Sequence, residues 1–284
     1  MMTLRALLAV LALSLLLRST LSSFLAGAAV TPDEHMALRW LAQVAGFALL
    51  FWLPAFVFRL RPVGLAQLTG AVPRPQALLL AACYGLVLLA FAWSEAAVET
   101  LVVAQFDPAI AYAQWAFHAD APPGSYRFSE WVALVLKMVV LVPIVEEFFF
   151  RGLLAGTLRK TKGVHAAAIF SSCLFTLLHY PRLYLVSTLV FAFALAYLYM
   201  ASGSLLLCIA IHAAFNAGVL VLENPGWQLL ARTPARLDQP GAWALELAVF
   251  LASSALLLHA FFRYRHAVIG AAEPSAQNRS YSAR

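Results

Sequence analysis

Charged residues are scarce in this chain of 284 residues: they make up 11% of it, while hydrophobic residues make up 63%. Soluble domains are roughly 45–50% apolar and about 25% charged, so this composition excludes an ordinary soluble domain. Cysteine is also scarce, and the spacing of the three cysteines matches neither a zinc knuckle nor a redox pair. The sequence therefore predicts an integral membrane protein whose function does not depend on its thiols.

Long apolar runs predict the membrane crossings, because a helix needs about 20 mostly apolar residues to span a bilayer. We expect eight crossings, near residues 6–30, 38–58, 76–93, 131–158, 164–180, 183–201, 204–222 and 242–262. The first also resembles a secretory signal, whose cleavage would leave seven. We prefer an uncleaved first helix, since its apolar stretch continues past Arg18. The expected fold class is an all-α, polytopic bundle of about eight transmembrane helices.

The chain divides into three parts by composition. Residues 1–130 hold three plain helices and, from residue 94 on, an acidic stretch that suits an external loop. Residues 131–262 hold nearly all of the intramembrane Glu, His, Arg and Asn residues, so we expect the functional core there. Residues 263–284 are polar and are expected to form a disordered tail.

The net charge of +6 comes from basic residues that are dispersed over short loops. This dispersal argues against a nucleic-acid partner and fits the positive-inside rule, by which cytoplasmic loops are enriched in Lys and Arg. An N-terminus placed inside the cell puts most of the basic residues on the cytoplasmic side. We therefore expect a protein embedded in the lipid bilayer, with both termini in the cytoplasm.

Two adjacent glutamates lie inside an expected membrane helix, where an ionised carboxylate costs roughly 3 to 10 kcal/mol or more. They open the first of three motifs, which are Glu146-Glu147-x-x-x-Arg151, Phe175-x-x-x-His179 and His212-x-x-x-Asn216. A spacing of four residues places the ends of each motif on one helix face. The helical rise, counted from the expected turns between the motifs, brings four residues to a similar depth: Glu146, His179, His212 and Asn216.

This set of side chains is suited to two kinds of chemistry. A carboxylate and an imidazole can deprotonate a water for hydrolysis, while a second imidazole and a carboxamide donate hydrogen bonds to the oxyanion. Alternatively, Glu146, His179 and His212 could hold a divalent metal, since two histidines and one carboxylate form a known catalytic zinc site. The residues alone leave both possibilities open.

The three motifs, in this order within a polytopic chain, resemble the type II CAAX prenyl endopeptidase and bacteriocin-processing family of intramembrane proteases. The resemblance covers residues 131–222 and implies an endopeptidase that cleaves within or beside the bilayer. It implies that Glu146 and His179 activate water and that His212 and Asn216 form the oxyanion hole. Glu147 and Arg151 would be a supporting pair, and Phe175 would form a wall of the site.

The sequence favours the metal-free, glutamate-type chemistry, in which no cofactor is expected and zinc remains the alternative. His-Glu-x-x-His, the usual zinc-protease motif, does not occur in the chain. Gly-x-Gly-Asp and Gly-x-Ser-Gly are also absent, which argues against two other classes of intramembrane protease. We expect a membrane-anchored protein or peptide as the substrate and, as for prokaryotic members of the family, the bacterial plasma membrane as the location.

Other functions remain open at this stage. Buried Glu and His residues also serve as relays in proton or ion transporters, and a silent immunity or scaffold protein can share the same fold. Against a transporter, the chain has no clear inverted repeat. The expected depth of Glu146 lies nearer to the outer face of the membrane, which favours an exported or membrane-anchored substrate over a cytoplasmic one.

Overall fold

The computed structural model describes residues 3–28, 32–57, 69–70, 72–111, 128–179, 185–222 and 240–270. These residues form helices without strands: α1 (Leu4–Ala28), α2 (Pro32–Val57), α4 (Pro75–Phe106), α6 (Phe128–Val135), η1 (Leu136–Leu141), α7 (Val142–Glu147), η2 (Phe148–Ala155), α8 (Gly156–Lys162), α9 (Val164–His179), α10 (Leu185–Ser202), α11 (Leu205–Leu222), η3 (Pro240–Trp243) and α12 (Ala244–Gly270). The expectation of an all-helical protein is therefore confirmed for this part of the chain.

Five helices in the described ranges are long and apolar enough to cross a membrane: α1, α4, α10, α11 and α12. A sixth, α9, is apolar but has only 16 residues. Helices occupy all eight of the segments in which crossings are expected, although only these five meet the length and composition of a span. The apolar helices thus confirm the membrane class, whereas the number of eight crossings is not confirmed.

Two expected boundaries are wrong. Helix α4 continues to Phe106, so the loop expected from residue 94 begins later than predicted. Its acidic side chains do not end the helix, because Glu95 is buried and hydrogen-bonds with Glu99 and with Ser187 of α10. Likewise, α12 runs on to Gly270, into the part expected to be a polar tail. The rest of that part, residues 271–284, lies outside the described residues.

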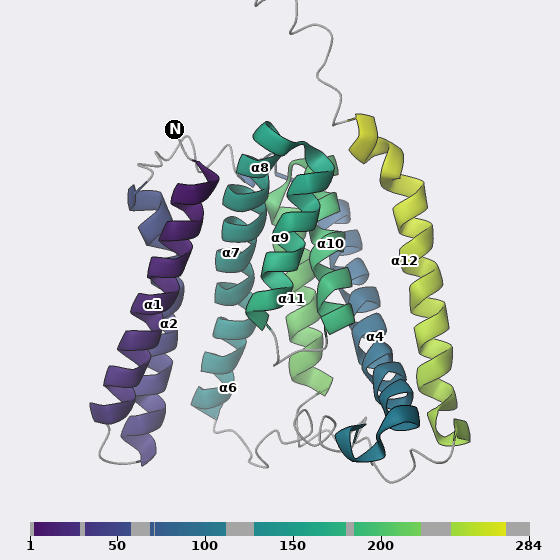
Figure 1. Cartoon of the computed structure of the whole chain (residues 1–284), viewed down its shortest axis with the longest axis horizontal. Helices are drawn as coiled ribbons and strands as arrows, with labels where there is room; N and C mark the ends of the chain where they lie inside the picture. The colour runs from purple at the N-terminus through teal and green to yellow at the C-terminus, as the bar shows by residue number, and fades with distance from the viewer. Residues whose placement is uncertain are drawn as a thin grey trace, which may run out of the picture.

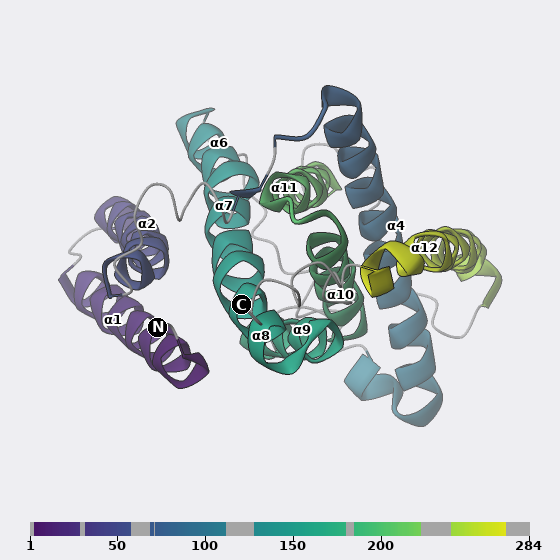
Figure 2. The same ribbon diagram turned by 90° about the horizontal axis from the view of Figure 1, so that it is seen from above.

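The helices surround a central group made of α7, α9, α10 and α11 (Figure 1). Helices α1 and α2 pack on each other as a pair on one side of this group, while α4 and α12 cover the opposite side (Figure 2). Helix α4 also packs along α11, and α9 packs along α10. The intramembrane polar residues of the three motifs all lie on helices of the central group or on η2, which continues α7.

Tight turns at glycines join consecutive helices in the second half of the chain. Gly163 separates α8 from α9 with φ at 84°, and Gly203 separates α10 from α11 with φ at 65°. Both values lie in the left-handed region that glycine adopts without a Cβ penalty. These short turns hold consecutive helices antiparallel, which is what places residues far apart in the sequence at one depth.

Helix α4 approaches α11 closely at Gly85. A Cβ atom at this position would lie 2.5 Å from the main-chain oxygen of Ile211 and 3.2 Å from Cβ of Ala214. Helix backbones come this close only where a residue has no side chain to separate them. Gly85 therefore fixes the distance between α4 and the helix that carries two of the motif residues.

We expect Gly85→Ala to destabilise the protein by about 1–3 kcal/mol, because the added methyl group forces the two helices apart. The matched control is Gly156→Ala, also within a helix, where a Cβ would meet its nearest atom at 3.7 Å. There the loss of glycine flexibility should be neutral or stabilise slightly. Thermal unfolding of both variants in detergent checks this, and equal midpoints would contradict the packing argument.

Candidate active site

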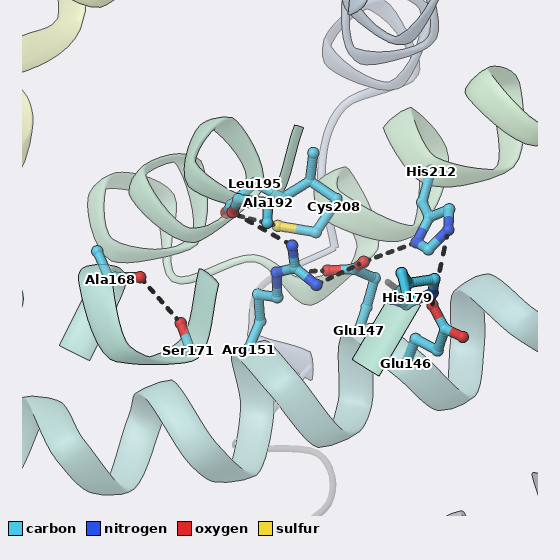
Figure 3. A network of polar contacts seen from close by, with 10 residues as sticks. All are labelled: Glu146, Glu147, Arg151, Ala168, Ser171, His179, Ala192, Leu195, Cys208 and His212. Carbon is cyan, nitrogen blue, oxygen red and sulfur yellow. Dashed lines mark hydrogen bonds and ion pairs between the residues drawn. The ribbon is translucent and has the colours of Figure 1, made fainter. Parts of the chain in front are cut away.

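Glu146 lies on α7 and faces two histidines from other helices. Its Oε2 atom is 3.8 Å from Nε2 of His179, the last residue of α9, and 3.9 Å from Nε2 of His212 on α11. Figure 3 shows the three side chains turned toward one another. The two distances exceed a direct hydrogen bond and are of the size that one small bridging molecule can span. Of the four residues that the helical rise placed at a similar depth, the structure thus brings these three together, and Asn216 has another partner.

Glu147, next in the chain, is held in a buried network behind Glu146, and His212 belongs to both groups of contacts. Its Oε2 lies 3.0 Å from Nε of Arg151, and its Oε1 accepts a hydrogen bond from Nη1 of the same arginine at 3.1 Å. Oε1 also lies 2.7 Å from Nδ1 of His212. Arg151 further donates to the main-chain oxygen of Ala192 on α10 at 3.2 Å. Glu147 is thus bound both to the arginine expected from the motif and to His212, which the sequence did not predict.

These contacts fix which nitrogen of each imidazole carries a proton. Nδ1 of His179 lies 2.7 Å from the main-chain oxygen of Phe175, and a carbonyl can only accept. Glu147, bound by the guanidinium through both oxygens, is the acceptor for Nδ1 of His212. Both histidines therefore use Nδ1–H to hold their orientation and present Nε2 to Glu146.

Aromatic rings pack around the histidines. The ring of Phe175 stacks on His179 with centroids 4.2 Å apart. The guanidinium of Arg151 lies 4.9 Å from the centroid of the Phe175 ring. Phe191 of α10 meets His212 edge to face at 5.0 Å. The sequence indicated Phe175 as a wall residue but missed Phe191, which has no motif around it. These rings restrict the motion of both imidazoles and exclude water from their sides.

Asn216 lies one turn beyond His212 on the same face of α11. It is buried, and its Nδ2 donates a hydrogen bond at 2.7 Å to the main-chain oxygen of Met138 in η1. The carboxamide thus bridges α11 to the helix that carries Glu146. The sequence predicted its depth but not this partner, because a main-chain carbonyl leaves no mark in the residue pattern.

Exposure decreases across the site from one side to the other. The side chain of His179 is 25% exposed and that of Glu146 is 14% exposed, whereas His212 is 5% and Glu147 is fully buried. The open side therefore lies at the end of α9, and the closed side lies against α11 and η2. Glu146 and His179 are therefore the more accessible side chains of the site, and His212 and Glu147 are the more buried ones.

The donor types at Glu146, His179 and His212 are those of a catalytic zinc site, and each imidazole has its other nitrogen fixed as zinc ligands do. In the described part of the chain, however, no three His, Cys, Asp or Glu side chains are grouped closely enough to hold a metal ion. Zinc therefore stays the alternative that the donor types allow, and metal-free chemistry stays a prediction.

We expect Arg151→Met to cost about 3–5 kcal/mol of stability, because it leaves the Glu147 carboxylate buried without its countercharge. Combining it with Glu147→Gln removes both charges and should recover part of the loss. Lys160→Met, at an exposed position on α8, is the control and should have little effect. Denaturant unfolding of the four proteins measures this, and an Arg151→Met variant as stable as the control would contradict it.

Comparison with known proteins identifies the central part of the chain. Residues 128–218 match the family model described as type II CAAX prenyl endopeptidase, Rce1-like. No curated protein and no solved structure matches the chain. The match begins at the first residue of α6 and encloses all three motifs, while residues 1–127 and 219–284 lie outside it. As the motifs predicted, residues 128–218 are similar to the Rce1-like type II CAAX prenyl endopeptidase family, and the apolar helices are those of a protein that is integral to the membrane.

Proposed function

We propose that this protein is a glutamate-type intramembrane endopeptidase that hydrolyses a peptide bond without a metal. The observation that carries the proposal is the arrangement of Glu146, whose Oε2 lies 3.8 and 3.9 Å from Nε2 of two histidines on separate helices. The family supports a CAAX-protease-type peptidase. The partly exposed position of Glu146 supports the assignment of the reacting group to it rather than to the buried Glu147.

In the proposed reaction, Glu146 accepts a proton from a water that His179 helps to orient. The oxygen of this water forms a bond to the carbonyl carbon of the peptide, and the carbonyl π electrons move onto its oxygen. The oxyanion electrons then re-form the C=O bond while the C–N bond breaks, and the amine nitrogen leaves with the proton that Glu146 had taken up. Atoms and charges balance, and the carboxylate is restored at the end of each cycle.

His212 and Asn216 are assigned to the oxyanion. Because Nδ1–H of His212 is engaged with Glu147, donation from Nε2 requires a second proton on this imidazole. The Glu147 carboxylate stabilises such an imidazolium by its opposite charge at 2.7 Å. Glu147 is thus a positioning residue in the proposal, and Arg151 and Phe175 support it by holding the carboxylate and the imidazoles in place.

The substrate class follows from where the site lies and is part of the proposal. A site surrounded by apolar helices favours a protein or peptide that is anchored in the membrane. Eight crossings with both termini in the cytoplasm, the arrangement expected from the basic residues, would place the open end of α9 nearer to the outer face. An exported substrate in a bacterial plasma membrane fits this orientation best.

We expect Glu146→Gln and His179→Ala to lower kcat by about 100- to 10,000-fold, the usual contribution of general acid–base groups. Purified protein in liposomes would be given a library of lipid-anchored peptides, with cleavage read by mass spectrometry. The matched control is Glu95→Gln, which changes a buried glutamate on α4 outside the Rce1-like domain. Its turnover should match that of the wild type.

Wild-type turnover in both site variants would reject the assignment. Proton flux that depends on Glu146, measured with a pH-sensitive dye in the same liposomes and without cleavage, would instead support a transporter. A protein that neither cleaves nor conducts would support an immunity or scaffold role.

Treatment with a chelator distinguishes the metal-free chemistry from a zinc enzyme with the same residues. The two imidazoles with fixed Nδ1 atoms are the observation that keeps zinc as a second candidate. We expect turnover to persist after dialysis against 1,10-phenanthroline. Turnover that is lost there and restored by added zinc would favour the zinc enzyme.

A further inference from the structure

The main-chain oxygen of Met138 has an unusual partner for a helix interior. It accepts a hydrogen bond at 2.7 Å from Nδ2 of Asn216, which belongs to another helix. Within a helix such an oxygen normally accepts from the main-chain N–H four residues on, or five residues on in a π-helix. For Met138 these two positions are Val142 and Pro143.

Neither position can serve Met138. The N–H of Val142 donates to the oxygen of Lys137, five residues back, at the end of the π-helical segment η1. Continuing this pattern by one residue would pair position 143 with Met138, but proline has no N–H. The oxygen of Met138 is therefore released from the helix at the level where Asn216 meets it.

The hydrogen bond to Met138 orients the carboxamide of Asn216. The Nδ2 group carries two N–H bonds. One is directed at Met138, which fixes the plane of the amide, and the second remains to donate to a ligand. Asn216 and Pro143 are both buried, so solvent does not compete with the hydrogen bond between Asn216 and Met138. The geometry of the second N–H thus depends on the first.

We propose that Pro143 is a positioning residue for Asn216: by withholding a main-chain N–H from Met138, it reserves that oxygen for the carboxamide. This rests on the proposed function, in which the remaining N–H of Asn216 binds the oxyanion. The main-chain contact itself does not depend on that function. An N–H supplied at position 143 competes for the Met138 oxygen and lets the carboxamide turn.

Kinetics test the role in the reaction. Pro143→Ala should lower kcat by about 3- to 10-fold, the effect of weakening one hydrogen bond in the transition state, with KM little changed. In an Asn216→Ala background the same substitution should cause no further loss. Pro54→Ala, at a buried proline inside α2, is the matched control and should leave both constants unchanged.

Proline at position 143 differs from alanine in two ways, its ring and its missing N–H. A residue that lacks both the ring and the N–H shows which of the two matters. Lactic acid incorporated there forms an ester and, like proline, donates no hydrogen bond. It should therefore retain wild-type kcat, whereas Pro143→Ala should not. Equal loss in both variants would assign the effect to the ring and overturn the proposal, as would wild-type kcat in Pro143→Ala.

Infrared spectroscopy with methionine labelled by ¹³C at the main-chain carbonyl tests the contact without any activity. Asn216→Ala should shift one labelled amide band to higher frequency, because Met138 loses its donor. In the Pro143→Ala background this shift should be absent or smaller, because residue 143 already donates. Equal shifts in both backgrounds would overturn the proposal even if the wild type proved to have no peptidase activity. Thermal unfolding of each variant confirms that it is folded.

Discussion

The buried carboxylate of Glu147 is the constraint on which the arrangement of the site depends. Placing such a charge away from water is costly unless it is paired with an opposite charge and hydrogen-bonded. Here Arg151 and His212 bind it, and Arg151 is bound in turn by the oxygen of Ala192. The network therefore fixes η2, α10 and α11 relative to one another. Any displacement of these helices would leave a charge without a partner, which makes the closed side of the site rigid.

The two adjacent glutamates perform different tasks because consecutive helical residues point about 100° apart. One carboxylate faces inward into the network, and the other faces His179 and the open side. Together with Arg151, the ionised pair leaves one negative charge. The proposed oxyanion hole requires a second proton on His212, which would leave these four side chains without net charge.

Much of this site could be predicted from the sequence because it depends on helical rise and short turns. Gly163 lies at the turn from which the depths of Glu146 and His179 were counted, and these two residues and His212 face one another as expected. Contacts between helices were less predictable. The bond from Glu147 to His212 depends on how far each helix is rotated about its axis, and residue spacing within one helix carries no information on that. The continuation of α4 past residue 94 was not predicted, because an acidic residue such as Glu95 is typical of a loop. Only the structure shows that Glu95 hydrogen-bonds with Ser187 of α10.

The rotation of the helix that carries the glutamates is set by its two π-helical segments. A π-helix bonds five residues back instead of four, so each such turn holds an additional residue and changes the face that follows it. Segment η1 precedes the glutamates and η2 follows them, so the face they present differs from that of a regular α-helix through the same residues. Pro143 directly follows Val142, the residue at which η1 ends, so one main-chain hydrogen bond is lost within one turn of the glutamates. The departure from regular helix geometry at η1 thus frees the main-chain oxygen that holds Asn216.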